Sequence, residues 1–152
     1  MTSSLLLCVD GSEASLAAMT SGLELLGRDG PIALVTVVDD PDPMLVTGTG
    51  FAGGVMTPEG LDEMTAAANE GAREILDETA ETLELADAPT YIVRGDAATA
   101  ICALATELDA RAIVIGSRGR SGFKRAVLGS VSDHVVRHAP CPVVITGHSL
   151  TT

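Results

Sequence analysis

The sequence predicts an α/β protein in which helices cover both faces of an open parallel sheet. Short apolar runs alternate along the chain with longer amphipathic ones, as expected of repeated β–α–β units. Apolar residues make up 46% of the 152 residues, yet Trp is absent and there are only two Phe and one Tyr. A core of Val, Ile, Leu and Ala is typical of parallel strands buried on both faces. At this length we expect one domain over residues 1–152.

Each element follows from its local pattern. The five buried apolar runs predict strands at residues 5–9, 32–38, 90–93, 112–115 and 143–146. Amphipathic periodicity predicts helices at residues 12–26, 58–84, 97–108 and 130–138. Ser12 is the expected N-cap of the first helix, and Ala88-Pro89 ends the second. The apolar positions of the helix at 58–84 are Leu61, Met64, Ala68, Ile75, Leu76 and Leu83.

Two segments are expected to lack regular structure. Residues 39–57 are rich in Gly and Pro and follow the second strand, so we expect a loop that is mobile when the site is empty. Residues 147–152 are expected to form a loose tail.

The charge of the chain excludes several classes of partner. A net charge of −12 argues against general binding to nucleic acid or to anionic membranes. Residues 1–4 carry no basic residue, and the apolar run at 5–9 is too short for a signal peptide or a membrane span. We therefore expect a cytoplasmic protein with no membrane association.

Cysteine and histidine spacing gives no metal site. Cys8, Cys102 and Cys141 lack metal-binding or redox spacing, and Cys8 and Cys102 lie in apolar patterns that predict buried small side chains. His134 and His138 are four residues apart, a spacing that can bind metal, but no further ligand follows at a suitable distance. We interpret them as a structural pair.

The most informative motif is the glycine loop Gly116-Ser117-Arg118-Gly119-Arg120-Ser121-Gly122, which directly follows the strand at 112–115. Gly129-Ser130 then opens a helix, and Ser130 to Asp133 has the form of a capping box. Glycines allow close approach of a ligand, and a helix N-terminus offers unpaired N–H groups to an anion. Six of the nine basic residues lie from Arg111 onward, with only one acidic residue. The loop is therefore predicted to hold phosphate.

Known phosphate motifs narrow this prediction. The chain has no Gly-Lys pair for a Walker A loop, and the loop spacing differs from the dinucleotide fingerprint. Val9-Asp10-Gly11-Ser12 follows the first strand, so it meets the glycine loop at the carboxyl edge of a parallel sheet. Both polar loops are expected to form one site.

The spacing Gly-x2-Gly-x9-Gly-Ser is filled by Gly116, Gly119, Gly129 and Ser130. Together with Val9–Ser12 and the segment His138-Ala139-Pro140-Cys141-Pro142-Val143-Val144, it resembles the ATP-binding branch of the universal stress protein family over Leu5–Thr146. The resemblance implies a five-stranded sheet of order 3-2-1-4-5, similar to the adenine-nucleotide alpha-hydrolases, with ATP at its carboxyl edge. It also implies a homodimer formed through Val143–Thr146.

The resemblance further implies roles for individual residues. Asp10 and the backbone of Val38 would contact adenine, and Gly116 and Gly119 would line ribose and phosphate. The phosphates would be held by Gly129, Ser130, Val131 and Ser132. Arg118 is a candidate phosphate contact, although Arg118, Arg120, Lys124 and Arg125 are equally consistent with a solvated basic loop.

Structural alternatives exist for several of these residues. Asp10 is also suited to capping the first helix or its turn, Ser130 to acting as an N-cap, and the glycines to tight turns. Asp10 and Ser130 are candidates to touch Mg²⁺ or Mn²⁺ bound with ATP.

The sequence favours a nucleotide-binding regulatory protein over an enzyme. Phosphoryl transfer needs an oriented nucleophile and stabilised charge, and no catalytic base can be identified from spacing. The alternative is a slow ATPase or a self-phosphorylating phosphotransferase on the same fold.

Overall fold

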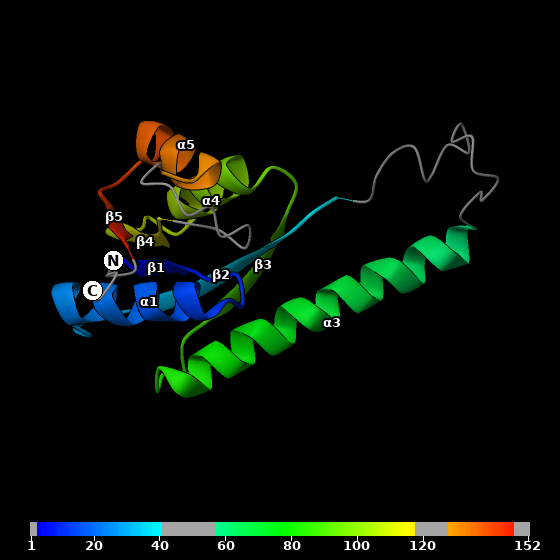
Figure 1. Cartoon of the computed structure of the whole chain (residues 1–152), viewed down its shortest axis with the longest axis horizontal. Helices are drawn as coiled ribbons and strands as arrows, with labels where there is room; N and C mark the ends of the chain where they lie inside the picture. The colour runs from blue at the N-terminus through cyan, green and yellow to red at the C-terminus, as the bar shows by residue number, and fades with distance from the viewer. Residues whose placement is uncertain (1–2, 41–56, 118–127, 148–152) are drawn as a thin grey trace, which may run out of the picture.

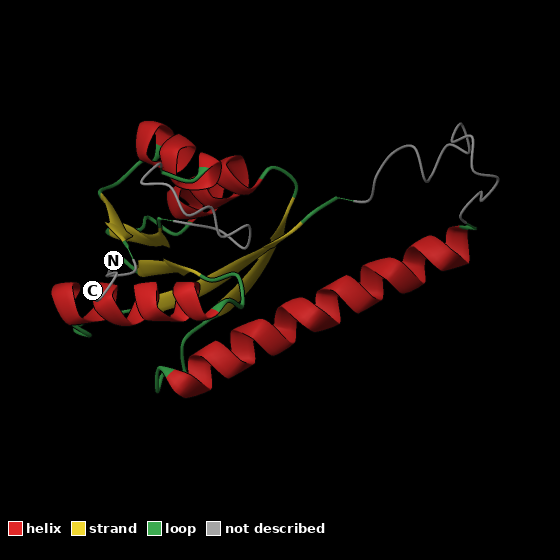
Figure 2. Ribbon diagram, viewed as in Figure 1, coloured by secondary structure: helices red, strands yellow, loops and turns green. Residues whose placement is uncertain are grey.

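Five parallel strands and four helices alternate along the chain in the computed structural model, which describes residues 3–40, 57–117 and 128–147 (Figures 1 and 2). The strands are β1 (Leu5–Cys8), β2 (Ile32–Val38), β3 (Thr90–Arg94), β4 (Ala112–Gly116) and β5 (Val143–Thr146). The helices are α1 (Glu13–Leu26), α3 (Pro58–Thr82), α4 (Ala97–Glu107) and α5 (Ser130–His138). Most of the loop expected at 39–57, much of the glycine loop and the tail after Gly147 lie outside the described residues.

The strands form one sheet in the order β3-β2-β1-β4-β5, which confirms the predicted fold class. All four pairings are parallel, and β1 at the centre pairs Leu5 with Ile32 of β2 and with Ala112 of β4. Successive strands therefore run outward from β1, first to one edge and then to the other. Such an order leaves a crevice at the carboxyl edge, where the direction of winding reverses.

Helices cover the sheet on both faces, α1 and α3 on one side and α4 and α5 on the other (Figure 1). Alternation along β2 shows both layers, since Leu34 packs toward α1 and α3 and Val35 toward α4 and α5. Both side chains are almost fully buried. Burial on both faces explains the continuous apolar runs that identified the strands. None of the described helices is long and apolar enough to cross a membrane.

Side-chain caps fix the start of three helices. Ser12 is the N-cap of α1, as predicted, and its hydroxyl accepts the N–H of Ser15 at 3.1 Å. Thr57 caps α3, with Pro58 in the first turn, and Asp96 caps α4. Each cap satisfies an N–H group that has no partner inside the helix.

Helix α3 ends at Thr82, two residues earlier than predicted. Glu84 has a φ of +57°, a left-handed conformation in which an α-helix cannot continue. The N–H of Leu85 then donates back to the carbonyl of Ala80 at 2.7 Å, which closes the helix end. Glycine usually occupies this position, so the sequence carries no local signal for the end, and Ala88-Pro89 lies beyond it.

Helix α3 is buried over only half of its length. The residues of α3 that are buried, Ala72, Leu76, Thr79 and Ala80, all lie in its C-terminal half. The earlier part extends past the sheet (Figure 1), so the apolar positions Leu61, Met64 and Ala68 lie outside the core. Helical periodicity identifies the apolar face but does not show how far the sheet reaches along it.

Candidate functional site

A cavity of about 400 Å³ opens at the carboxyl edge of the sheet. Its walls come from the ends of β1, β2 and β4 and from the first turns of α4 and α5. The lining residues are Cys8, Val9, Asp10, Ser15, Val35, Thr36, Val37, Asp39, Ala97, Ile101, Ile115, Gly116, Gly129, Ser130, Val131 and Ser132. This volume lies within the usual range for small-molecule sites. Asp10 of the first polar loop and Gly116 at the start of the glycine loop therefore line the same cavity, as predicted.

Helix α5 begins at this cavity without a side-chain cap. Its N-cap is Gly129, which has no side chain, and the Gly129 carbonyl accepts the N–H of Asp133 at 2.9 Å. The interpretation of Ser130 as the N-cap is therefore wrong, because the helix begins one residue earlier than the capping-box pattern implies. Ser130 is the first helical residue, and the first-turn N–H groups at Ser130, Val131 and Ser132 have no acceptor within the helix.

Two hydrogen bonds hold the start of α5 against the end of β4. Ser132 is buried, and its hydroxyl donates to the carbonyl of Gly116 at 2.8 Å. The N–H of Gly129 donates to the carbonyl of Ser117 at 2.9 Å. The helix end and the first glycine of the loop are thus fixed relative to each other. Preorganisation of this kind lowers the entropic cost of binding a ligand there.

Asp10 combines two roles that the sequence left open. Its carboxylate accepts the Ser12 N–H at 2.8 Å and the Ser12 hydroxyl at 2.6 Å, so it braces the turn that leads into α1. Its own N–H donates to the buried Ser15 hydroxyl at 3.2 Å. Asp10 also lines the cavity. The capping turn therefore holds the carboxylate beside the space where a ligand would bind.

The other predicted residues are less directly placed. Val38 pairs with Arg94 of β3, and its carbonyl accepts the N–H of Gly95 at 3.3 Å. Its neighbours Val37 and Asp39 line the cavity, whereas Val38 does not. Arg118 and Gly119 lie outside the described residues, as do the other basic residues of the glycine loop. The adenine contact of Val38 and the phosphate contact of Arg118 stay predictions.

The second helix at the cavity, α4, is electrostatically different from α5. Its N-cap Asp96 accepts the Thr99 N–H at 3.0 Å and the Thr99 hydroxyl at 2.7 Å. These hydrogen bonds lower the pKa of the Asp96 carboxyl, which is therefore charged at neutral pH. The N-cap carboxylate offsets the positive end of α4, whereas the N-cap of α5 is glycine and its first-turn Asp133 is ion-paired with Arg137 at 3.0 Å. The cavity consequently has one end suited to anions and one end that is not.

The thiol of Cys8 forms part of the cavity wall. Burial raises its pKa well above the ordinary value, with smaller contributions from Cys102 and Cys141. The thiol is therefore neutral at physiological pH and behaves as an apolar surface rather than as a nucleophile. The sequence predicted buried side chains for Cys8 and Cys102, but both are only half-buried. They lie at the margin of the core between the sheet and helices α4 and α5.

The two histidines, His134 and His138, contact each other on α5. The two ring centroids are 4.2 Å apart, and Nδ1 of His138 lies 2.9 Å from the carbonyl oxygen of His134. Within residues 3–40, 57–117 and 128–147, no group of three or more His, Cys, Asp or Glu is arranged to hold a metal ion.

Sequence reasoning missed the apolar part of the cavity. Val35, Val37, Ala97 and Ile101 form much of the wall near β2 and α4, and Asp39 lies at its rim. The only signal for Val35 and Val37 was their position in the strand, because alternate residues of a strand point to the same face.

An open α/β sheet with a polar crevice beyond its central strands defines a class of proteins that bind ligands at this edge. Residues 1–147 match the universal stress protein family. Universal stress protein YxiE of Bacillus subtilis is 31% identical over 148 residues, which cover 95% of this chain and 99% of YxiE. The chain therefore belongs to the universal stress protein family.

Solved structures of other proteins share this fold. Universal stress protein UspA from Lactobacillus plantarum has a TM-score of 0.72 at 26% identity, and the match covers 95% of this chain and 97% of UspA. A universal stress protein family member from Arabidopsis thaliana, solved with AMP bound, has a TM-score of 0.62 at 20% identity. That match covers 97% of this chain and 93% of the Arabidopsis chain.

Proposed function

We propose that this chain is a regulatory protein that binds an adenine nucleotide, with ATP as its ligand, in the cavity at the carboxyl edge of the sheet. The observation that carries the proposal is the N-terminus of α5, which opens on the cavity with a glycine at the N-cap and no capping side chain. Free N–H groups and the helix dipole together favour a phosphate there. The AMP bound to the Arabidopsis protein of the same fold supports an adenine nucleotide.

The charges around the cavity suggest how the nucleotide lies. Asp10 and Asp39 place carboxylates at the ends of β1 and β2, and Asp96 offsets the positive end of α4. Phosphates would be repelled from that side and attracted to α5. The base and sugar would then pack against the apolar wall on the side of β2 and α4, which is formed by Val37, Ala97 and Ile101. Asp10 would lie near the base, and Gly116 between the two ends.

Calorimetric titration with ATP, AMP and adenosine tests this arrangement. We expect ATP to bind at least about tenfold more tightly than adenosine, because only the phosphates contact the N–H groups of α5. Titrations with and without Mg²⁺ show whether a bound cation contributes. Equal affinities for ATP and adenosine would contradict the phosphate site, and no binding below millimolar by folded protein would contradict the proposal as a whole.

The same samples separate a regulator from an enzyme. A regulator is expected to retain intact ATP over many hours, because the described part of the cavity offers no histidine or lysine to orient a nucleophile or to stabilise the transition state. Multiple-turnover release of phosphate, lost on Asp10→Ala with ATP affinity preserved, would favour the slow ATPase instead.

We also propose a homodimer formed through β5. This strand lies at one edge of the sheet, and its residues Val143–Thr146 are only partly buried. An apolar edge strand is usually covered or paired, and a two-fold axis would let two copies pair antiparallel. Light scattering should give twice the chain mass of 15.5 kDa. Charged substitution of Val144 should return the mass to that of one chain, and a wild-type monomer would contradict the dimer.

A further inference from the structure

The wall of the cavity carries a buried hydroxyl group that has no hydrogen-bond partner within the part of the chain that the structure describes. This group belongs to Thr36 of β2, which lines the cavity and is only 2% exposed. Unlike Nε of Arg111, its oxygen is not closed off from solvent. The hydroxyl therefore faces the open space of the cavity. Burial of a hydroxyl without a partner is unfavourable, so the group is available to a ligand.

Ser15 of α1 adds a second hydroxyl to the same cavity. It is 5% exposed, and its oxygen accepts the N–H of Asp10 at 3.2 Å. A serine hydroxyl can donate a hydrogen bond as well as accept one, and within the described residues this proton has no acceptor. The cavity thus contains two buried hydroxyl donors, Thr36 and Ser15, neither of which donates to another described residue.

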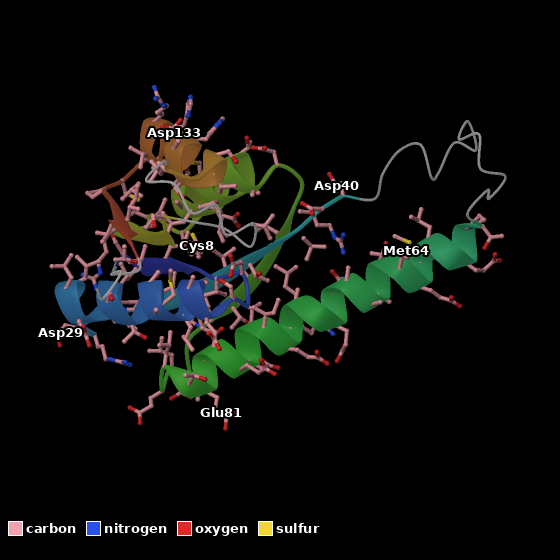
Figure 3. The ribbon with its side chains drawn as sticks, in the orientation of Figure 1. Cys8, Asp29, Asp40, Met64, Glu81 and Asp133 are labelled. Atoms are coloured by element: carbon pink, nitrogen blue, oxygen red, sulfur yellow. The ribbon has the colours of Figure 1, made fainter. Side chains whose placement is uncertain are left out.

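The early end of β1 explains why these hydroxyls can reach a ligand. Strand β1 ends at Cys8, which pairs with Val35, whereas β2 continues to Val38. The cavity lies beyond the end of β1 and is bounded by residues from both faces of the sheet. Val9 in its wall packs in the core beneath α1 and α3, and Cys8 packs on the side of α4 and α5 (Figure 3).

A base in this space would meet an apolar wall on one face of the sheet and hydroxyl groups on the other. Side chains alternate along β2, so Thr36 lies on the face that α1 covers, as Ser15 of α1 does. Val37 lies on the opposite face together with Ile101. A heterocyclic base combines an apolar ring surface with ring nitrogens that accept hydrogen bonds, so it suits both walls.

We propose, on the basis of the proposed nucleotide site, that Thr36 is a base-recognition residue whose hydroxyl donates a hydrogen bond to a ring nitrogen of the bound purine. At this end of the described wall the other acidic side chains are Asp10 and Asp39, whose carboxylates accept hydrogen bonds and do not donate them. A ring nitrogen needs a donor, whereas an exocyclic amine needs an acceptor. Hydroxyl and carboxylate groups together therefore match the two kinds of polar group on adenine.

Thr36→Val tests this contact, because valine has nearly the shape of threonine without the hydroxyl. Calorimetric titration should show ATP binding weakened by about tenfold in Thr36→Val and kept within about twofold in Thr36→Ser, which retains the hydroxyl. The matched control is Thr79→Val in α3. Thr79 is also buried, but its hydroxyl donates to the carbonyl of Ile75 at 2.7 Å and it does not line the cavity. ATP affinity should be unchanged in this control.

Deaza analogues of ATP identify the group that the Thr36 hydroxyl contacts. In 1-deaza-, 3-deaza- and 7-deaza-ATP one ring nitrogen is replaced by a C–H group. The wild type should bind one of these analogues more weakly than ATP, and Thr36→Val should weaken that analogue no further, because the same hydrogen bond is already missing. Additive losses with all three analogues would overturn the proposal. Coupling of Thr36→Val to 2′-deoxy-ATP instead would place the hydroxyl on the sugar and would also overturn it.

Thermal unfolding without nucleotide gives a readout that does not depend on ligand binding. Because the Thr36 hydroxyl has no partner among the described residues, Thr36→Val should leave Tm unchanged or raise it. A marked fall in Tm would show that the hydroxyl is already paired within the protein and would overturn the role of Thr36. Equal ATP affinity in Thr36→Val and the wild type would overturn that role alone, whereas no ATP binding by folded wild type would overturn the proposed function with it.

Discussion

Gly22→Ala is expected to destabilise the folded chain by about 2 kcal/mol, although alanine is the better helix former. Gly22 lies in α1, and a Cβ atom there would be 2.4 Å from Cγ1 of Val114 on β4. Val114 is fully buried and β-branched, so it has no room to move away. The helix or the strand must shift, and the packing between them is lost. Urea denaturation followed by circular dichroism measures the change in the free energy of unfolding.

The matched control is Gly71→Ala in α3. A Cβ at Gly71 meets nothing within 4 Å, so only the helix propensity changes, and we expect a gain of about 0.5–1 kcal/mol. The two substitutions are chemically identical and should have opposite signs. The double variant Gly22→Ala with Val114→Ala should lose less free energy of unfolding than the sum of the two single variants, because the space left by the shortened Val114 side chain accepts the new methyl group. Stabilisation by both glycine substitutions would contradict the close approach of α1 to β4.

This pair of glycines shows which parts of the fold the sequence can predict. Apolar runs and helical periodicity are local, so all the described strands and helices could be placed to within a few residues. The contact between Gly22 and Val114 joins residues far apart in the sequence. The end of α3 at Thr82 also could not be predicted from the sequence, because the left-handed residue that follows it, Glu84, is not glycine. Local pattern defines the elements, but long-range packing decides how much a substitution at each residue changes the free energy of unfolding.

The candidate site divides in the same way. Asp10, Gly116 and the residues from Gly129 to Ser132 carry polar or glycine signals, and the structure brings them to one cavity. The apolar wall at Val37 and Ile101 carries no signal that distinguishes it from the core. The bounds of α5 were predicted, but its N-cap was assigned to Ser130 instead of Gly129, because the sequence alone does not show the hydrogen bond from the Gly129 N–H to the Ser117 carbonyl.

The identity of the N-cap residue of α5 matters for the proposed function. A serine N-cap would use its hydroxyl to satisfy a first-turn N–H, in competition with a ligand. A glycine N-cap cannot do so, which costs the helix little relative to serine but leaves the N–H groups for an anion. Ser132, the buried serine of this turn, instead donates to the Gly116 carbonyl and fixes the turn in place. The arrangement leaves the N–H groups open for the proposed phosphate at the expense of local helix stability.

Gly129→Asp is therefore expected to weaken ATP binding by roughly 100-fold while changing the free energy of unfolding by only a few tenths of a kcal/mol. Gly129 has φ −59° and ψ 152°, a conformation that any residue adopts without strain. The new carboxylate would accept first-turn N–H groups of α5 as a strong N-cap and would repel the phosphates from the same position. Calorimetric titration measures the affinity, and thermal unfolding without nucleotide measures the stability.

Gly129→Asn separates the two causes of this loss. Asparagine caps a helix about as well as aspartate but carries no charge, so Gly129→Asn should weaken ATP binding to an intermediate degree. Adenosine, which has no phosphate, should bind both variants as it binds the wild type. If Gly129→Asp retained wild-type affinity for ATP, the phosphates would lie away from α5. If adenosine binding fell equally, the substitution would have disturbed the cavity as a whole, and the charge argument would fail. The expected order of ATP affinity, with wild type above asparagine and asparagine above aspartate, follows only if the N–H groups and the dipole of α5 hold the phosphates.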